Sequence, residues 1–178
     1  MEEEAEQGER GGRTQMLTCT VLGIDHTNFF YRVCSLCERT ISSPSGDETD
    51  APASSSLCKF CHPHPHPASA SASKRLFRIL MSVATETKVF NVICFDRVAR
   101  VLFGCSADDF FNFAKLHPFS DVAVNEILEG EMFTMALTKP LNGNARHLRL
   151  ASAVPLSSTF QPVIQVLREY YTSSHTSP

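Results

Sequence analysis

Residues 75–95 read RLFRILMSVATETKVFNVICF, and this stretch decides the fold that the sequence predicts. In residues 75–84, apolar side chains alternate with polar ones, as in a β-strand with one buried face. The predicted inward residues are Phe77, Ile79, Met81 and Val83, with Arg78 and Ser82 on the other side. A second apolar run, KVFNVICF over residues 88–95, follows the short connector 85–87. We therefore expect an antiparallel hairpin.

Four more segments have the composition of strands. Residues 16–24 (MLTCTVLGI) and 28–33 (NFFYRV) precede the hairpin and are rich in β-branched, aromatic and other apolar residues. Residues 131–138 and 146–154 follow it, separated by the turn signal Asn142-Gly143. The predicted inward residues of this last pair are Phe133, Met135, Leu137, Leu148 and Leu150, and His147 and Arg149 point outward.

Helices are predicted between residue 96 and residue 128 and again near the end of the chain. Asp96 is the expected N-cap of a helix over residues 97–103 that Gly104 ends, and Ser106 is the expected N-cap of a second helix ended by Pro118. A third helix is expected over residues 121–128. Residues 160–171 form an amphipathic pattern, with Val163, Val166, Leu167 and Tyr170 on one stripe.

The order of these elements predicts the fold class. A strand, an insertion, a hairpin, helices, two strands and a final helix are the order of a five-stranded Greek-key OB-fold barrel, which is mainly β with helices. A chain of 178 residues is long enough for one such domain. We expect the domain to cover residues 14–172, with disordered tails at 1–13 and 173–178.

The charge distribution limits the kinds of partner. The net charge is −3, but five acidic residues lie within the first ten residues of the chain. From residue 74 to residue 171 there are 11 basic and 9 acidic side chains, so nucleic-acid binding requires a local patch rather than a global positive field. Neither a membrane span nor a secretory signal is indicated, so we expect an intracellular protein with no membrane partner.

Two cysteine pairs predict a metal site. Cys34-Ser-Leu-Cys37 and Cys58-Lys-Phe-Cys61 are C-x2-C motifs, whose sulfur atoms can bind one tetrahedral ion. Four thiolates leave no open position for a water, so a structural zinc ion is expected in a knuckle over residues 33–62. His62 is an alternative fourth ligand.

The segments around the second cysteine pair, residues 42–56 and 62–73, are of low complexity and are predicted to be flexible loops. The isolated Cys19, Cys94 and Cys105 are predicted to be core thiols.

The cysteine knuckle, FRILMSV (residues 77–83) and VICFDRVARVLFGCSADDF (residues 92–110) together resemble the C-terminal OB domain family of the large subunit of replication protein A. The resemblance runs from about residue 18 to residue 171. It implies an OB-fold, a structural zinc, contacts to single-stranded DNA, a nuclear location and a C-terminal helix used in subunit assembly. It places an aromatic-arginine step at Phe77 and Arg78.

Candidate nucleic-acid contacts follow from how single strands are held. A groove of cations binds the phosphates, and aromatic rings stack on the bases. The candidates at outward strand positions or beside the loop between the last two strands are Arg78, Lys88, Phe90, Lys139, Arg146, His147 and Arg149. Phe77, Phe95, Phe110, Phe113 and Phe133 are predicted to be core residues, because large aromatic residues at regular spacing are usually buried.

Two other functional classes compete with nucleic-acid binding. One is a non-catalytic interaction module in which the helix at residues 160–171 binds a partner subunit or a second copy. The other is a zinc deaminase, which requires a His-x-Glu element and an open zinc position. No His-x-Glu occurs in the sequence. We therefore expect neither catalysis nor a small-molecule substrate.

Overall fold

The computed structural model describes residues 14–41, 58, 60, 73–140 and 146–173. The elements are β1 Gln15–Ile24, β2 Phe30–Cys34, β3 Ser73–Ala84, β4 Val89–Phe95, α1 Asp96–Phe103, α2 Ala107–Leu116, α3 Ser120–Leu128, β5 Met132–Thr138, β6 Leu148–Pro155 and α4 Val163–Ser173. Within the described ranges, no helix has the length and apolar character needed to cross a membrane.

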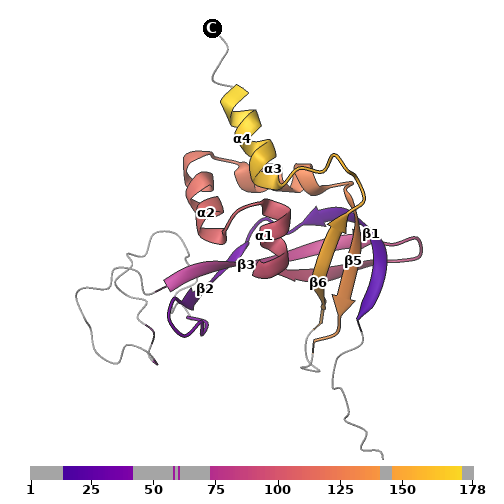
Figure 1. Cartoon of the computed structure of the whole chain (residues 1–178), viewed down its shortest axis with the longest axis horizontal. Coiled ribbons are helices and arrows are strands. Elements are labelled where there is room, and N and C mark those ends of the chain that lie inside the picture. The colour runs from indigo at the N-terminus through magenta and orange to yellow at the C-terminus, as the bar shows by residue number, and fades with distance from the viewer. Residues whose placement is uncertain (1–13, 42–57, 59, 61–72, 141–145, 174–178) are drawn as a thin grey trace, which may run out of the picture.

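Five of the strands close into a barrel. Their hydrogen-bonded order is β1-β5-β6-β4-β3, and β3 pairs back onto β1. All neighbours are antiparallel except β4 and β6, which are parallel. The short β2 is a sixth strand, which pairs with the first half of β3 and extends away from the barrel (Figure 1). The predicted five-stranded barrel, mainly β with helices, is confirmed.

The alternation predicted for β3 is confirmed, and it defines the inside of the barrel. Phe77, Ile79, Met81 and Val83 are all buried, whereas Arg78 is exposed. The pairing of β3 with β4 then fixes the faces of β4, because directly opposite residues share a face. Val83 lies opposite Phe90, and Met81 opposite Val92, so these β4 side chains point inward. Phe133, Met135 and Leu137 of β5 complete this side of the core.

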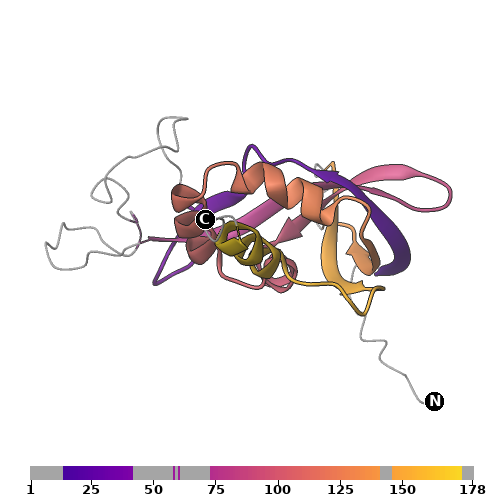
Figure 2. The same ribbon diagram turned by 90° about the horizontal axis from the view of Figure 1, so that it is seen from above.

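The helices lie on one side of the barrel, where aromatic residues join them to β2 and β3 (Figure 1). The Phe77 ring lies 4.6 Å from the Phe103 ring of α1, which lies 5.0 Å from the Phe110 ring of α2. Phe29 contacts both of these helical rings. Each aromatic pair contributes about 0.5–1.5 kcal/mol beyond area burial, so this cluster fixes the helices on the barrel. From above, α3 and α4 run side by side (Figure 2).

The helix starts differ in part from the prediction. Ser106 caps α2 as expected, because its hydroxyl accepts a hydrogen bond from the Asp109 N–H at 3.1 Å. Asp96 is not the N-cap of α1: it is the first helical residue, and its carboxylate accepts a hydrogen bond from the backbone N–H of Phe77 at 3.1 Å. The carboxylate still lies at the positive end of the helix dipole, and it also ties α1 to β3.

Three other expectations need correction or lie beyond the described residues. Ser73 opens β3 rather than ending a loop, and Ser173 belongs to α4 rather than to the tail. On α4 the buried stripe is Val163, Ile164 and Leu167, whereas Tyr170 is 64% exposed, because the helix turns its Ile164 side toward the rest of the core. The Asn142-Gly143 turn, the tail at 1–13 and nearly all of the two low-complexity segments lie outside the described residues.

Gly104 ends α1 in a conformation that only glycine adopts easily. Its φ is 73°, and a Cβ added there would lie 2.6 Å from Cβ of Pro162. Gly130 has a similar φ of 84°, but an added Cβ would have no neighbour within 4 Å. A side chain at Gly130 would therefore meet backbone strain alone, whereas one at Gly104 would meet both backbone strain and steric overlap.

We predict that Gly130→Ala lowers the free energy of unfolding by about 1–2 kcal/mol, the strain of a left-handed residue. Gly104→Ala should cost about 1–3 kcal/mol more, because the added methyl group collides with Pro162. Urea denaturation of both variants measures the difference. Equal losses would show that the segment before α4 moves away without cost.

Candidate nucleic-acid interface and cysteine cluster

On the outer face of the barrel, two of the predicted arginines lie close to an aromatic ring, and the three side chains come from three strands. Arg78 of β3 lies directly opposite Phe95 of β4, and Ile93 of β4 lies beside Arg149 of the parallel strand β6. Because paired residues share a face, Arg78, Phe95 and Arg149 all point outward. Both arginines are exposed, as predicted. We call this the outer β3–β4–β6 face.

Phe95 is the centre of this face, although it was predicted to be a core residue. Its ring is only half-buried, and the Arg149 guanidinium carbon lies 5.3 Å from the ring centroid. The Tyr31 ring of β2 meets it edge-on at 6.5 Å and 85°. Phe95 has the same strand parity as Asn91 and Ile93, opposite to the buried Val92 and Cys94. The sequence alone leaves the orientation open, because the two polar residues of the run, Lys88 and Asn91, lie at positions of opposite parity.

Tyr31 is a second aromatic residue that the sequence reasoning did not place at the site. It comes from β2, beyond the closed barrel, and reaches the end of β4. Burial raises the pKa of its phenol, and the nearby carboxylates of Asp96 and Glu38 raise it further. The Tyr31 side chain is therefore neutral at physiological pH, so it adds an aromatic surface without a negative charge.

Phe90 does not lie on the outer face, so its predicted orientation is wrong. It pairs with the buried Val83 and packs partly buried against the core at one end of the barrel. Lys88 lies above it, with its ammonium nitrogen 5.1 Å from the Phe90 ring centroid. The prediction places the outward residues of 88–95 one position away from where the structure has them. A shift of one residue moves every side chain of a strand to the opposite face.

The remaining predicted cations gather around the barrel end near Lys88. Lys88 and Lys139 line the same hollow, of about 690 Å³, together with the start of β1. Lys139 and Arg146 are exposed on the two sides of the segment joining β5 to β6, and His147 is half-buried just before β6. The predicted set therefore divides into the outer β3–β4–β6 face and this second basic group.

Three cysteines meet at the end of β2. Cys34 ends the strand, and its carbonyl accepts a hydrogen bond from the Glu38 N–H in a tight turn that brings Cys37 back toward it. The Sγ atoms of Cys34, Cys37 and Cys58 all lie within 4.8 Å of one another, and those of Cys37 and Cys58 are 3.6 Å apart. A tetrahedral zinc site with Zn–S bonds of about 2.3 Å has sulfur atoms about 3.8 Å apart. This cluster could hold a metal ion.

The electrostatics of the cluster favour a thiolate. Backbone N–H groups of Cys37 and Leu36, helped by the neighbouring thiols, lower the pKa of Cys34 to about 7. Burial instead raises the pKa of Cys94 to about 12 and that of Cys105 to about 11. Metals bind the thiolate form, so the cluster and not the core thiols suits a metal. Cys61 and His62, the candidates for a fourth ligand, lie outside the described residues.

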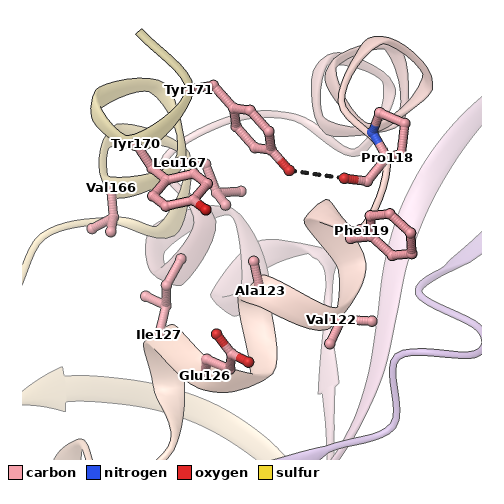
Figure 3. Close-up of a pocket in the computed structure, with 10 residues that line it drawn as sticks. All are labelled: Pro118, Phe119, Val122, Ala123, Glu126, Ile127, Val166, Leu167, Tyr170 and Tyr171. Atoms are coloured by element: carbon pink, nitrogen blue, oxygen red, sulfur yellow. Dashed lines mark hydrogen bonds between the residues drawn. The ribbon is translucent and has the colours of Figure 1, made fainter. Parts of the chain in front are cut away.

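An apolar groove of about 510 Å³ lies between α3 and α4 (Figure 3). Val122, Ala123 and Ile127 line it from α3, and Val166, Leu167 and the two tyrosines line it from α4. Phe119, at its end, is 78% exposed, and Glu126 is its one acidic residue. The Tyr171 hydroxyl donates a hydrogen bond to the Pro118 carbonyl at 2.8 Å, which links α4 to the start of α3.

Comparison with solved structures finds the same architecture in replication proteins. The chain is similar to a chain of a replication protein A heterotrimer bound to single-stranded DNA, with a TM-score of 0.57 and 17% identity over 92% of this chain and 36% of that one. It is also similar to a chain of yeast RPA bound to single-stranded DNA, with a TM-score of 0.57 and 16% identity over 97% of this chain and 92% of that one. This likeness establishes the fold.

The chain shares its fold with these replication protein A chains. The chain spans about a third of the first of these neighbours and almost all of the second. No protein-family model matches the sequence, and no curated protein matches it either.

Proposed function

We propose that this OB-fold binds single-stranded nucleic acid, most favourably single-stranded DNA, without catalysing a reaction. The observation that carries the proposal is Phe95, a half-exposed aromatic ring held between Tyr31 and two outward arginines on the outer β3–β4–β6 face. Large aromatic rings are normally buried. A ring kept at the surface among cations suits a ligand that is both flat and anionic.

The chemistry of each side chain follows from its place. A base stacks on the Phe95 ring, a contact worth about 1–3 kcal/mol that does not depend on sequence. Arg78 and Arg149 lie on either side of it and pair with the flanking phosphates. Because Arg149 also lies over the Phe95 ring, its guanidinium holds the ring in place.

The second basic group extends the proposed contact region around the barrel. Lys88, Lys139, Arg146 and His147 lie at or beside the segment joining β5 to β6, where OB-folds commonly hold their ligand. In this proposal they contact phosphates, and Phe90 supports Lys88 from the inner side.

We also propose that the cysteine cluster holds one structural zinc ion. Cys34, Cys37 and Cys58 are the described ligands, and Cys61 is the proposed fourth, with His62 as the alternative. When bound, the ion crosslinks the knuckle and supplies no catalysis, because a site closed by four ligands activates no water. Since β2 carries both Cys34 and Tyr31, the knuckle also supports the aromatic end of the outer face.

The biological setting is a proposal from the same resemblance. By its order of knuckle, hairpin and glycine-ended helix, the chain also resembles the OB domain of the DNA damage-induced apoptosis suppressor. With the structural likeness to replication protein A chains, this supports a role in DNA replication, repair or recombination in the nucleus. We propose that residues 14–172 form one domain for this role.

A second candidate function is assembly with a partner subunit, and the groove between α3 and α4 favours it. The groove is apolar with one acidic residue, Glu126, so it suits an apolar helix that carries a basic side chain. Both exposed rings at its rim, Phe119 and Tyr170, are large enough to anchor such a helix.

For nucleic-acid binding, we predict that Phe95→Leu weakens binding of a labelled oligothymidylate by about 1–3 kcal/mol, because the stacking surface is lost. Phe111→Leu is the matched control, since Phe111 is a half-buried ring on α2 that packs under Arg75. Fluorescence anisotropy with zinc-loaded protein measures both. Equal affinities of the two variants would refute the stacking role of Phe95.

For the metal site, we predict about one zinc ion per chain in the purified protein, measured by atomic absorption. Cys34→Ser should lower the zinc content, whereas Cys105→Ser should not. Zinc affinity should fall as the pH drops below about 7, because the Cys34 thiol, whose pKa is about 7, then takes up a proton that competes with the metal. Comparing Cys61→Ser with His62→Ala identifies the fourth ligand. Full zinc content in the Cys34 variant would exclude this site.

For the groove, we predict saturable binding of an amphipathic helical peptide of leucine and arginine. The chain has no tryptophan and three tyrosines, two of which line the groove, so tyrosine fluorescence reports the binding. Val166→Asp should abolish the signal, and Gln165→Glu, on an exposed position of α4, should not. An unchanged titration with Val166→Asp would remove the groove from consideration.

A further inference from the structure

A second hollow opens directly beside Phe95. It has a volume of about 490 Å³ and lies between β2, the start of β3, the end of β4, the outer side of α1 and the start of α2. Tyr31 and Phe95 form its aromatic side, and Lys74, Arg97 and Arg100 are among its basic residues. The hollow therefore shares its aromatic side with the outer β3–β4–β6 face.

The charges in this hollow do not cancel. Glu38 forms an ion pair with Lys74 at 2.6 Å, and Asp108 forms one with Arg75 at 3.2 Å. Asp96 accepts the backbone N–H of Phe77. Arg97 and Arg100 form no ion pair among the described residues, and the guanidinium of Arg97 donates instead to the Ala151 carbonyl at 3.2 Å. The lining has four basic side chains, Lys74, Arg75, Arg97 and Arg100, against three carboxylates, so the hollow keeps a net charge of +1.

Arg97 and Arg100 lie beside the arginines of the outer β3–β4–β6 face and extend that basic surface. Arg97 follows Phe95 by two residues and hydrogen-bonds to Ala151 of β6, two residues after Arg149. Arg97 and Arg100 are three apart on α1, both are exposed, and residues at that spacing lie on one side of a helix with Cβ atoms about 5–6 Å apart. Arg78, Arg149, Arg97 and Arg100 thus border one continuous aromatic and cationic surface.

We propose that a single strand bound on the outer face continues past Phe95 into this hollow, where Arg97 and Arg100 contact its phosphates. This inference rests on the proposed nucleic-acid function and adds to it a direction and a longer site. Only a polyanion with flat groups satisfies the whole surface, because the arginines border the rings of Phe95 and Tyr31 on the same side. The Lys74–Glu38 ion pair marks the far side of the hollow.

The test compares oligothymidylates of about 8 and about 16 nucleotides, lengths within the usual range for an OB fold. Binding of each by the zinc-loaded full chain is measured by anisotropy at several salt concentrations. The variant is Arg97→Ala/Arg100→Ala. The matched control is Lys115→Ala/Arg168→Ala, which removes the same charge from exposed positions of α2 and α4.

We expect the Arg97→Ala/Arg100→Ala variant to lower the slope of log affinity against log salt on the longer oligonucleotide by about 1.4, since each phosphate contact on a single strand contributes about 0.7. The loss on the shorter oligonucleotide should be smaller. The control should keep the wild-type slope, and all variants should keep the wild-type melting temperature.

Two failures are distinguishable. If neither oligonucleotide binds the folded wild-type protein, the proposed nucleic-acid function is wrong and the extension is wrong with it. If both bind, but the Arg97→Ala/Arg100→Ala variant keeps the wild-type slope on the longer oligonucleotide, the function stands and the extension past Phe95 is overturned. A slope lowered equally by the control also overturns it, because the effect would then reflect net charge alone.

Discussion

The burial of Phe77 is the constraint on which the rest of this structure depends. Its side chain is fully buried against Phe30, Phe103 and Phe110, so one residue joins β2, α1 and α2 to the barrel. A shift of β3 by one residue would expose this ring and bury Arg78, at a cost of several kcal/mol, which is a large share of the about 5–15 kcal/mol that stabilises a domain. The register of β3 is therefore fixed, and through its pairing with β4 it keeps both Arg78 and Phe95 at the surface.

The same strand explains how a chain of net negative charge can present a cationic face. Strand β3 pairs with β2 along its first half and with β1 along its second, while β4 runs along its other edge. This places outward side chains of β3 and β4, together with β6 beyond them, on one continuous surface. The acidic residues beside it are engaged: Asp96 by the Phe77 N–H and Asp108 by Arg75. Local geometry, rather than net charge, creates the basic surface.

The cysteine cluster and the outer face are connected through β2. This strand is only five residues long, and besides its pairing with β3 it has a single bridge, between Val33 and Thr40, among the described residues. It therefore gains little stability from its own hydrogen bonds. A metal ion bound at Cys34 would fix the end of β2 and so keep Tyr31, three residues earlier, in its place beside Phe95. In this view, the knuckle supports a binding surface rather than forming one.

Much of the secondary structure and part of the candidate site could be predicted from the sequence, because they depend on local periodicity. Three features depend only on residues close together in the sequence. They are the alternation in residues 75–84, the cap at Ser106 and the spacing of Cys34 and Cys37. These features determined the buried face of β3, the start of α2 and the first half of the cysteine cluster.

Only the tertiary structure decided which side chains meet. Tyr31, Phe95 and Arg149 come from three strands far apart in the sequence, and their contact depends on the closure of the barrel and on the register of β4. The apolar run 88–95 has too few polar residues to show its inward face, so Phe90 and Phe95 exchange roles when it is read alone. The groove beside Tyr170 likewise exists only because α3 and α4 pack together. Local pattern specifies elements, whereas sites that join distant segments form only when those elements pack.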